Sequence, residues 1–381
     1  MRIGILGTSW PYRGGLTAFN ERLARQFVAE GNEVEIFTFT MQYPDFLFPG
    51  KTQYSDLPKP EDLSITRTMN SINPFTWIRT ARRIQKAGIQ LLVIKFWIPL
   101  MAPCLGSIAR LCRRNGIEVV SILDNVFPHE PHFWDKWLIR YYIGSVDRFV
   151  AMSASVQEDC RRFLPEEKKG LVALSPHPLY DNFGEPVEKS EARRVLGLPQ
   201  DKTLLLFFGF IRDYKGLDLL MKAYAKVLSD QGPRTKDLLL VVAGEFYNNG
   251  EQYTALENEL GLKGAIEWRT DFIPDDQVRY YFSAADLIVQ PYKTATQSGV
   301  TQIAYHFERP MLVTNVGGLA EIVPDGKVGY VCAVNKDDIA RAIKAFAAMD
   351  KESREKLFSN NIKTEKEKYA WNKMTKVICD L

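Results

Sequence analysis

The chain has 381 residues, a formal net charge of +3, 46% hydrophobic residues and 25% charged residues. This length exceeds what one hydrophobic core usually spans, so we expect two domains with the composition of an ordinary soluble globular protein. The net charge is too small to indicate nucleic acid as the main partner. Five scattered cysteines, with no CxxC and no close Cys/His spacing, argue against disulfides or a zinc site and indicate a reducing cytoplasm.

The N-terminal half alternates apolar runs with helical patterns. Residues 2–7 predict a strand rather than a signal peptide, because no basic region precedes an apolar segment. Residues 16–30 carry apolar side chains at helical spacing, and Gly31-Asn32 ends that helix. Further strands are predicted at 33–39, 91–97, 118–123 and 147–151. Such alternation predicts a parallel sheet covered on both faces.

One apolar window, Leu91 to Ala109, resembles a membrane span. Lys95 lies inside it, and Pro99 and Pro103 would interrupt a helix. We therefore expect a buried strand over 91–97, a turn, and a helix from about Pro103.

The alternation restarts after a charged stretch, residues 185–200. It predicts strands at 204–209, 237–243, 265–268, 286–290 and 311–314, with a helix over 216–229. The predicted architecture is two doubly wound, Rossmann-like α/β domains facing a central cleft. Their expected limits are 1–185 for the first domain, 190–368 for the second, and 369–381 for a C-terminal helix that crosses back to the first.

Residues 286–321 form the most informative segment. An apolar strand ends at Pro291, small polar residues follow, and a helical pattern starts at about Val300. A second buried strand then leads into Gly317-Gly318. Backbone N–H groups at such a strand–loop–helix junction suit an anion such as a diphosphate.

Two glycine-containing loops add to this pattern. In 209–216, a strand ends in Gly209, and Arg212 and Lys215 precede the next helix, where both could face phosphate oxygens. A solvated turn explains the two cations equally well. Gly14 and Gly15 precede the first helix and permit close approach by a ligand, although GxGxxG is absent.

With these motifs together, the chain resembles the retaining GT-B glycosyltransferases of glycosyltransferase family 4 almost from end to end. The most specific parts are the strand and Lys-Gly of 209–216, Ala243-Gly244-Glu245, the strand 285–291, RPMLVTNVGGLAEIV of 309–323, and Tyr369-Ala370-Trp371. The resemblance implies transfer of a sugar from a nucleotide-sugar to an acceptor hydroxyl. It places the donor on the second domain and the acceptor, a carbohydrate or lipid-linked glycan, on the first.

The resemblance also assigns donor-binding residues. Lys215 matches the lysine that neutralises the donor diphosphate, and Arg212 substitutes for an arginine whose position holds Phe210. Two family glutamates are absent: the second position is Gln302, whose amide can still bridge ribose hydroxyls. The first falls near Thr294 or the Thr296–Gly299 loop. Gly209, Gln297, Ser298, Gly299 and Val300 complete the predicted donor site, and Glu321 occupies the GGxxE position, where we expect a structural or capping role.

On the first domain, Gly14, Gly15, Asp124 and His129 are the predicted acceptor-binding residues. The family histidine at the end of strand 118–123 is replaced by Leu123, and His129 could take over, or simply satisfy a loop backbone. The segment Met152-Ser153-Ala154-Ser155, between a strand and a helix, is expected to cap that helix. Lys215, Arg212 and His129 are the predicted catalytic residues, in a front-face mechanism that needs no cofactor and, since no Asp-x-Asp ends a strand, no metal.

Two stretches of the first domain combine aromatic and basic residues, near 75–86 and 133–142. A core face with a solvated face explains them more simply than contact with anionic lipid, but peripheral membrane contact on the cytoplasmic side stays open. Two other functions also stay open. A nucleotide-sugar epimerase would need carboxylates in the cleft, and a non-catalytic binding scaffold would explain the absent glutamates.

Overall fold

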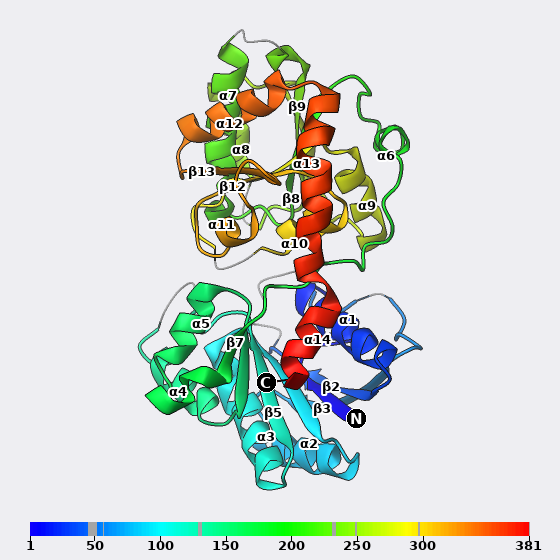
Figure 1. Ribbon diagram of the computed structural model, residues 1–381, viewed down its shortest axis with the longest axis vertical. Coiled ribbons are helices and arrows are strands. Elements are labelled where there is room, and N and C mark those ends of the chain that lie inside the picture. Colours follow the sequence, from blue (N-terminus) through cyan, green and yellow to red (C-terminus); the bar gives the residue numbers. More distant parts are fainter. Residues whose placement is uncertain are drawn as a thin grey trace. The chain divides into compact units, whose positions relative to one another are not determined.

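The computed structural model describes residues 1–44, 52–55, 57–128, 132–230, 234–247, 250–295 and 298–380. The chain forms two compact units, Met1–Pro176 with Trp371–Leu381, called the N-terminal unit, and His177–Ala370, called the C-terminal unit. Each is a parallel sheet covered by helices (Figure 1). The division between the units falls after Pro176, whereas the charged stretch in the sequence placed it near residue 190.

The sheet of the N-terminal unit has the order β3-β2-β1-β4-β5-β6-β7. Its central strands β1, β4, β5 and β6 are almost wholly buried, which is why the sequence shows apolar runs there rather than alternation. The strands are β1 Arg2–Leu6, β2 Glu33–Met41, β3 Ser64–Asn70, β4 Leu91–Phe96, β5 Glu118–Leu123, β6 Arg148–Ala151 and β7 Val172–Leu174. The sequence did not predict β3, which is rich in polar residues, or β7, which is only three residues long.

Helices cover both faces of this sheet. The C-terminal helix packs against α1, with the rings of Phe19 and Trp371 5.1 Å apart and the Thr375 hydroxyl donating to Glu30 at 2.6 Å. A separate core joins α2, α3 and α4 to the sheet. The helices are α1 Gly15–Ala29, α2 Pro74–Lys86, α3 Ala102–Arg114, α4 Asp135–Ile143, α5 Ala154–Arg161 and α14 Trp371–Asp380, with short 3-10 turns at Pro99–Met101 (η2) and Glu166–Leu171 (η3).

The apolar window at 91–109 is strand β4, the turn η2 and the start of α3, as the sequence predicted. Among the described residues, no helix is long and apolar enough to cross a membrane. Ser153 caps α5 by accepting a hydrogen bond from the backbone N–H of Val156 at 3.3 Å, which confirms the expected capping role.

The sheet of the C-terminal unit has the order β10-β9-β8-β11-β12-β13. Its strands are β8 Thr203–Phe208, β9 Leu238–Ala243, β10 Ile266–Arg269, β11 Leu287–Gln290, β12 Met311–Thr314 and β13 Gly329–Cys332. The helices are α6 Lys189–Leu196, α7 Leu217–Ser229, α8 Glu251–Glu259, α9 Asp275–Ala284, α10 Gly299–His306, α11 Leu319–Ile322, α12 Lys336–Ala348 and α13 Lys351–Lys366, with 3-10 turns at Asp213–Lys215 (η4), Thr235–Asp237 (η5) and Glu367–Tyr369 (η6). In this unit α7 packs against α12, and α6 against α9 (Figure 1).

Both sheets reverse their direction of growth beside their first strand. Strand β1 pairs with β2 on one side and β4 on the other, and β8 pairs with β9 and β11. At such a switch point, the loops that leave the two strands turn to opposite faces and open a crevice at the carboxyl ends of the strands. The doubly wound fold predicted from sequence is therefore confirmed, and each unit has one natural place for a ligand.

A buried acid fixes the opposite, amino-terminal edge of the second sheet. Asp286 accepts hydrogen bonds from Arg193, Lys189 and the backbone N–H of Leu204, all at 2.7 Å. Burial alone would raise the pKa of Asp286, but these partners, Lys189 foremost, hold it below its usual range. The carboxylate thus ties α6 to the starts of β8 and β11.

Replacing Asp286 with asparagine should lower the free energy of unfolding by about 3 kcal/mol at neutral pH, because two cations lose their counter-ion. Since the folded pKa is depressed, the stabilisation is present above the unfolded pKa of about 3.9 and disappears as pH falls through the folded pKa. Urea unfolding at neutral and acid pH measures both effects. Asp201→Asn, at an exposed acid of the same unit, is the control; equal losses in both variants would contradict the account.

Candidate functional site

The loop after β8 and the start of α10 meet at the switch point of the C-terminal unit. Gly209 has a φ of 92°, and a Cβ added there would lie 2.9 Å from the Lys215 Nζ and 3.9 Å from a methyl group of Val300. These three predicted donor-site residues are therefore brought together. Any side chain at position 209 would fill the space that the lysine now occupies.

The loops after β8 and β11 are locked to each other. Gly216 has a φ of 70°, and a Cβ there would overlap the carbonyl oxygen of Pro291. The backbone N–H of Lys293 donates to the Tyr214 carbonyl at 2.7 Å. The Lys293 ammonium pairs with Asp213 at 2.8 Å and Asp218 at 2.9 Å. The position of Lys215 is thus set by two loops rather than by one flexible turn.

Lys215 carries a buried charge that no acid among the described residues balances. Its relative exposure is 9%, and no carboxylate of the described residues forms an ion pair with it. Burial, and secondarily the nearby Arg212 guanidinium, lower the pKa of Lys215 to about 8. An isolated buried cation is unfavourable, so the site is built to receive an anion.

Arg212 stands beside this lysine with its guanidinium over the ring of Tyr247, 3.8 Å from the ring centre. The stacked ring supports the guanidinium without neutralising it. Its Nε is buried and has no hydrogen-bond partner within the described part of the chain. Lys215 and Arg212 therefore lie together at the predicted diphosphate position, and neither forms an ion pair with an acid of the described residues.

The first turn of α10 is held by its own side chains. Ser298 caps the helix by accepting a hydrogen bond from the Val300 N–H at 3.2 Å, and its hydroxyl lies 3.3 Å from that of Tyr292. A Cβ at Gly299 would lie 2.7 Å from the ring of Tyr180, so packing already requires glycine at this position. The Val300 N–H is thus engaged by the cap in the free protein.

Gln302, which stands at the position of the second family glutamate, is fully buried in α10. Neither its Oε1 nor its Nε2 has a hydrogen-bond partner among the residues that the structure describes. The neighbouring Thr301 donates to Gln290 at 3.1 Å, so the amide of Gln302 stands apart from that pair. An unpaired buried amide costs about 1–3 kcal/mol, which a ligand hydroxyl reaching it would recover. Gln297 lies outside the described residues.

Glu321 is exposed in the first turn of the short helix α11, after β12 and Gly317-Gly318. An acid in that position suits the amino end of a helix. Glu321 follows β12, the strand next to β11 in the sheet order, and its predicted capping role stays a prediction.

In the N-terminal unit, the predicted acceptor residues follow β1 and β5. Gly14 has a φ of 103° and precedes α1, which Gly15 begins; a Cβ at Gly14 would meet no atom within 4 Å. Asp124 follows β5 and pairs with the buried Lys95 at 2.8 Å. His129 lies outside the described residues.

Lys95 is a functional candidate that sequence reasoning treated only as an interruption of an apolar run. Its ammonium lies 3.3 Å from the ring centre of Phe19, and burial lowers its pKa despite the pairing with Asp124. The signal was present, because a lysine inside a buried strand requires a partner. Tyr247 and Tyr180, in contrast, reach the site through contacts that no local pattern indicates. Among the described residues, no three His, Cys, Asp or Glu side chains converge as metal ligands do.

Two doubly wound units in one chain form the GT-B architecture. Comparison with known protein families supports the same class. Residues 188–364 match the family model Glycosyl transferases group 1, and residues 13–171 match Glycosyltransferase Family 4. The chain belongs to the GT-B glycosyltransferases that these two families describe.

Individual relatives are distant. The chain is 28% identical over 210 residues to a D-inositol 3-phosphate glycosyltransferase of Streptomyces avermitilis, a match that covers 54% of this chain and only 45% of that protein. It is 24% identical to an uncharacterized glycosyltransferase of Methanocaldococcus jannaschii over 99% of this chain and 96% of that one.

Among solved structures, the fold is similar to sucrose-phosphate synthase of Thermosynechococcus elongatus, with a TM-score of 0.73, 18% identity, and coverage of 100% of this chain and 99% of that chain. HepE of Anabaena, solved with UDP, has a TM-score of 0.73, 15% identity and full coverage of both chains. At these identities the structures establish the fold.

Proposed function

We propose that the protein transfers a sugar from a nucleotide-sugar donor to an acceptor hydroxyl, with retention of configuration and without a required divalent metal. The observation that carries the proposal is the buried, unbalanced charge of Lys215 beside Arg212 at the switch point of the C-terminal unit. The HepE structures solved with UDP and UDP-glucose support a nucleotide-sugar as the donor class.

The chemical role of the two cations follows from where charge develops. When the bond between the anomeric carbon and the phosphate oxygen breaks, negative charge grows on the leaving diphosphate. Lys215 offers a point charge and Arg212 a planar fork for these oxygens. Preorganised positive charge in a partly dry site is among the strongest contributions to catalysis, and it supplies here what a metal ion would otherwise supply.

Retention is proposed from the resemblance to the retaining enzymes of family 4, and the acids near Lys215 favour a front-face route over a double displacement. Asp213 and Asp218 are both tied to Lys293, so neither is free to attack the sugar. In a front-face displacement the acceptor oxygen bonds to the anomeric carbon on the side that the diphosphate leaves. The acceptor proton passes to the leaving phosphate oxygen, and no protein nucleophile is needed.

The acceptor is assigned to the carboxyl edge of the N-terminal unit. Gly14 leaves space at the start of α1, and Asp124 is fixed by Lys95, so that a carboxylate of defined position faces this edge. A carboxylate is a hydrogen-bond acceptor for sugar hydroxyls. A carbohydrate or lipid-linked glycan fits this chemistry, with glycan, polysaccharide or glycolipid as the product.

A nucleotide-sugar-binding scaffold is the second candidate, and Gln302 is the observation that favours it. The position of a family glutamate holds a buried amide with no partner, which preserves the packing of α10 but not the charge. An epimerase would interconvert the donor sugar without any acceptor.

Incubation with UDP-, GDP- and ADP-sugars separates these functions. We expect donor hydrolysis or transfer that persists in EDTA and falls by about 10²- to 10³-fold in Lys215→Gln, as when one charge-stabilising donor is removed. Lys263→Gln, at an exposed lysine of the same unit, should keep full activity. Nucleotide binding without turnover by any acceptor would favour the scaffold, and isomerised donor without acceptor the epimerase.

The affinity for UDP should depend on pH through Lys215. A bound diphosphate favours the charged lysine, so the pKa in the complex exceeds the value of about 8 in the free protein. UDP affinity should therefore be nearly constant up to about pH 7 and fall by up to tenfold per pH unit well above pH 8. Calorimetric titrations between about pH 7 and 9.5 test this expectation. The decline should be absent in Lys215→Gln; the same decline in both proteins would assign it to another group.

A further inference from the structure

Helices α2, α3 and α4 present a strongly basic surface on the N-terminal unit. The three helices cover one face of the sheet, with α3 packed against both neighbours. Helices α2 and α3 contain no Asp or Glu. We call the outward side of the layer the basic face; its cations are Arg79, Arg82, Arg83, Lys86, Arg110, Arg113, Arg114, Lys136 and Arg140.

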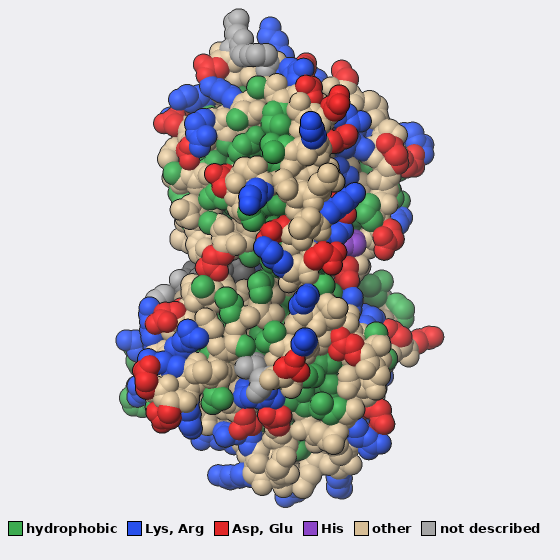
Figure 2. All heavy atoms as spheres, viewed as in Figure 1, with side chains coloured by type: hydrophobic (Ala, Val, Ile, Leu, Met, Phe, Trp, Pro, Cys, Tyr) green, Lys and Arg blue, Asp and Glu red, His purple; other side chains and the backbone are tan. Residues whose placement is uncertain are grey.

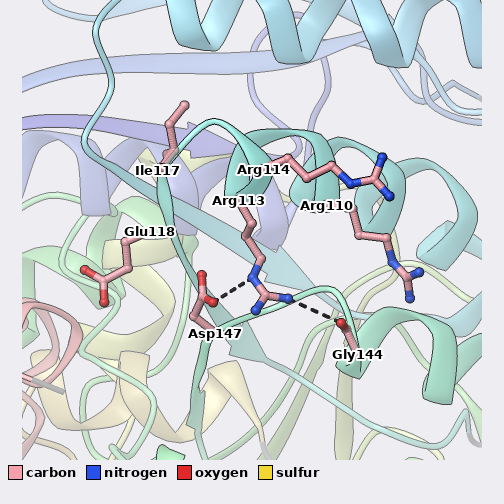
Figure 3. A pocket seen from close by; sticks show the side chains of 8 residues that line it. Arg110, Arg113, Arg114, Ile117, Glu118, Gly144 and Asp147 are labelled. Atoms are coloured by element: carbon pink, nitrogen blue, oxygen red, sulfur yellow. Dashed lines mark hydrogen bonds and ion pairs between the residues drawn. The ribbon is translucent and has the colours of Figure 1, made fainter.

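Few acids counter these charges. Asp135 is buried and accepts a hydrogen bond from the backbone N–H of His132. Asp147 pairs with Arg113 at 2.6 Å, and Glu118 pairs with Arg148 at 2.8 Å. Figure 3 shows Arg113 held between Asp147 and the carbonyl of Gly144, while the guanidinium groups of Arg110 and Arg114 lie outside that pair.

Two cavities interrupt the basic face. One, of about 600 Å³, lies at the end of α3 and is lined by Arg110, Arg113 and Arg114 together with the acids Glu118 and Asp147. The other, of about 720 Å³, lies along α2 and is lined by its four cations with Phe75 and Ile78. In Figure 2, lysine and arginine side chains project from the end of this unit that carries α2 and α3. The cavity along α2 offers four cations and no acid to an anionic group, whereas in the first cavity Arg113 is already paired with Asp147.

Large aromatic side chains accompany the cations and are not part of the core. Phe75, Phe133 and Trp137 are 83%, 88% and 82% exposed. The sequence left open whether these aromatics form a core face, and the structure shows that Ile84 and Tyr142 do so instead. The ring of Trp134 contacts those of His132 and Phe133, with centroid separations of 4.8 and 4.6 Å.

The exposed aromatics share an edge of the unit. Phe75 lies in the first turn of α2, and Trp137 lies in that of α4. Each helix follows a strand of the parallel sheet, β3 and β5 respectively, so both begin at the carboxyl edge. Gly14 and Asp124 follow strands at the same edge. The aromatics therefore lie on the side of the unit to which the acceptor is assigned.

We propose that the basic face docks on a membrane surface that contains anionic phospholipid, with Phe75, Phe133 and Trp137 entering the headgroup region. Binding to a membrane surface has two contributions: aromatic side chains insert into the headgroup region, and cations are attracted to lipid phosphate. The basic face supplies both. A soluble polyanion would use the cations but leave the aromatics without a role. If the protein is the proposed glycosyltransferase, on which this inference rests, docking at a membrane implies that its acceptor is a membrane-bound molecule.

Flotation with phospholipid vesicles tests the proposal on the full chain. We expect binding to phosphatidylcholine vesicles that contain phosphatidylglycerol, weak binding without it, and loss of binding in high salt. Each cation contributes about fivefold to partitioning, so Arg79→Gln/Arg82→Gln/Arg83→Gln should weaken binding by up to about a hundredfold. Phe133→Ser/Trp137→Ser should weaken it at every salt concentration.

Matched controls lie away from the basic face. Lys263→Gln/Lys356→Gln removes exposed cations of the C-terminal unit, and Leu57→Ser replaces an exposed leucine; both variants should float like the wild type. Unchanged flotation of the basic-face variants would overturn the proposal, as would capture by heparin or RNA without vesicle binding. Melting temperature and UDP affinity in solution should be unchanged in all variants. The membrane-docking proposal and the proposed donor site are therefore tested independently.

Discussion

The ammonium group of Lys215 is the constraint on which the account of this protein depends. It is buried at the carboxyl edge of a parallel sheet, and no carboxylate in the described part of the chain neutralises it. Two glycines fix the position of this ammonium group. Gly209 leaves the space that the ammonium fills, and Gly216 allows the adjoining loop to pack against Pro291. Because the described residues hold this cation firmly without a counter-ion, we propose that a ligand supplies the balancing charge.

Other buried charges in the chain show the contrast. Asp286 receives two cations and a backbone N–H, and Lys95 is paired with Asp124. Asp286 joins α6 to the starts of β8 and β11 and therefore stabilises the fold. The Lys95 pair has a second use, since it fixes a carboxylate at the edge assigned to the acceptor. Pairing thus distinguishes these structural charges from Lys215, whose charge we propose is balanced by the donor.

The sequence predicted much of this architecture because buried parallel strands read as apolar runs and their loops contain glycine. It predicted the strands on both sides of each switch point, and with them the places of Lys215 and Arg212. It did not predict β3, β7 or β13, which are polar or very short. The support of Arg212 by Tyr247, the closeness of Gly299 to Tyr180 and the unpaired amide of Gln302 arise from contacts between distant segments, which no local pattern records. The helical spacing of Phe133 and Trp137 likewise could not show whether they face the core or solvent, because an aromatic stripe on either side of a helix has the same sequence period.

The most direct measurement is a crystal structure of the protein with UDP. The account predicts that the diphosphate lies within hydrogen-bond distance of the Lys215 Nζ and the Arg212 guanidinium, at the crevice between the loops after β8 and β11. A nucleotide bound elsewhere on the C-terminal unit, with Lys215 still buried and unpaired, would contradict the central claim.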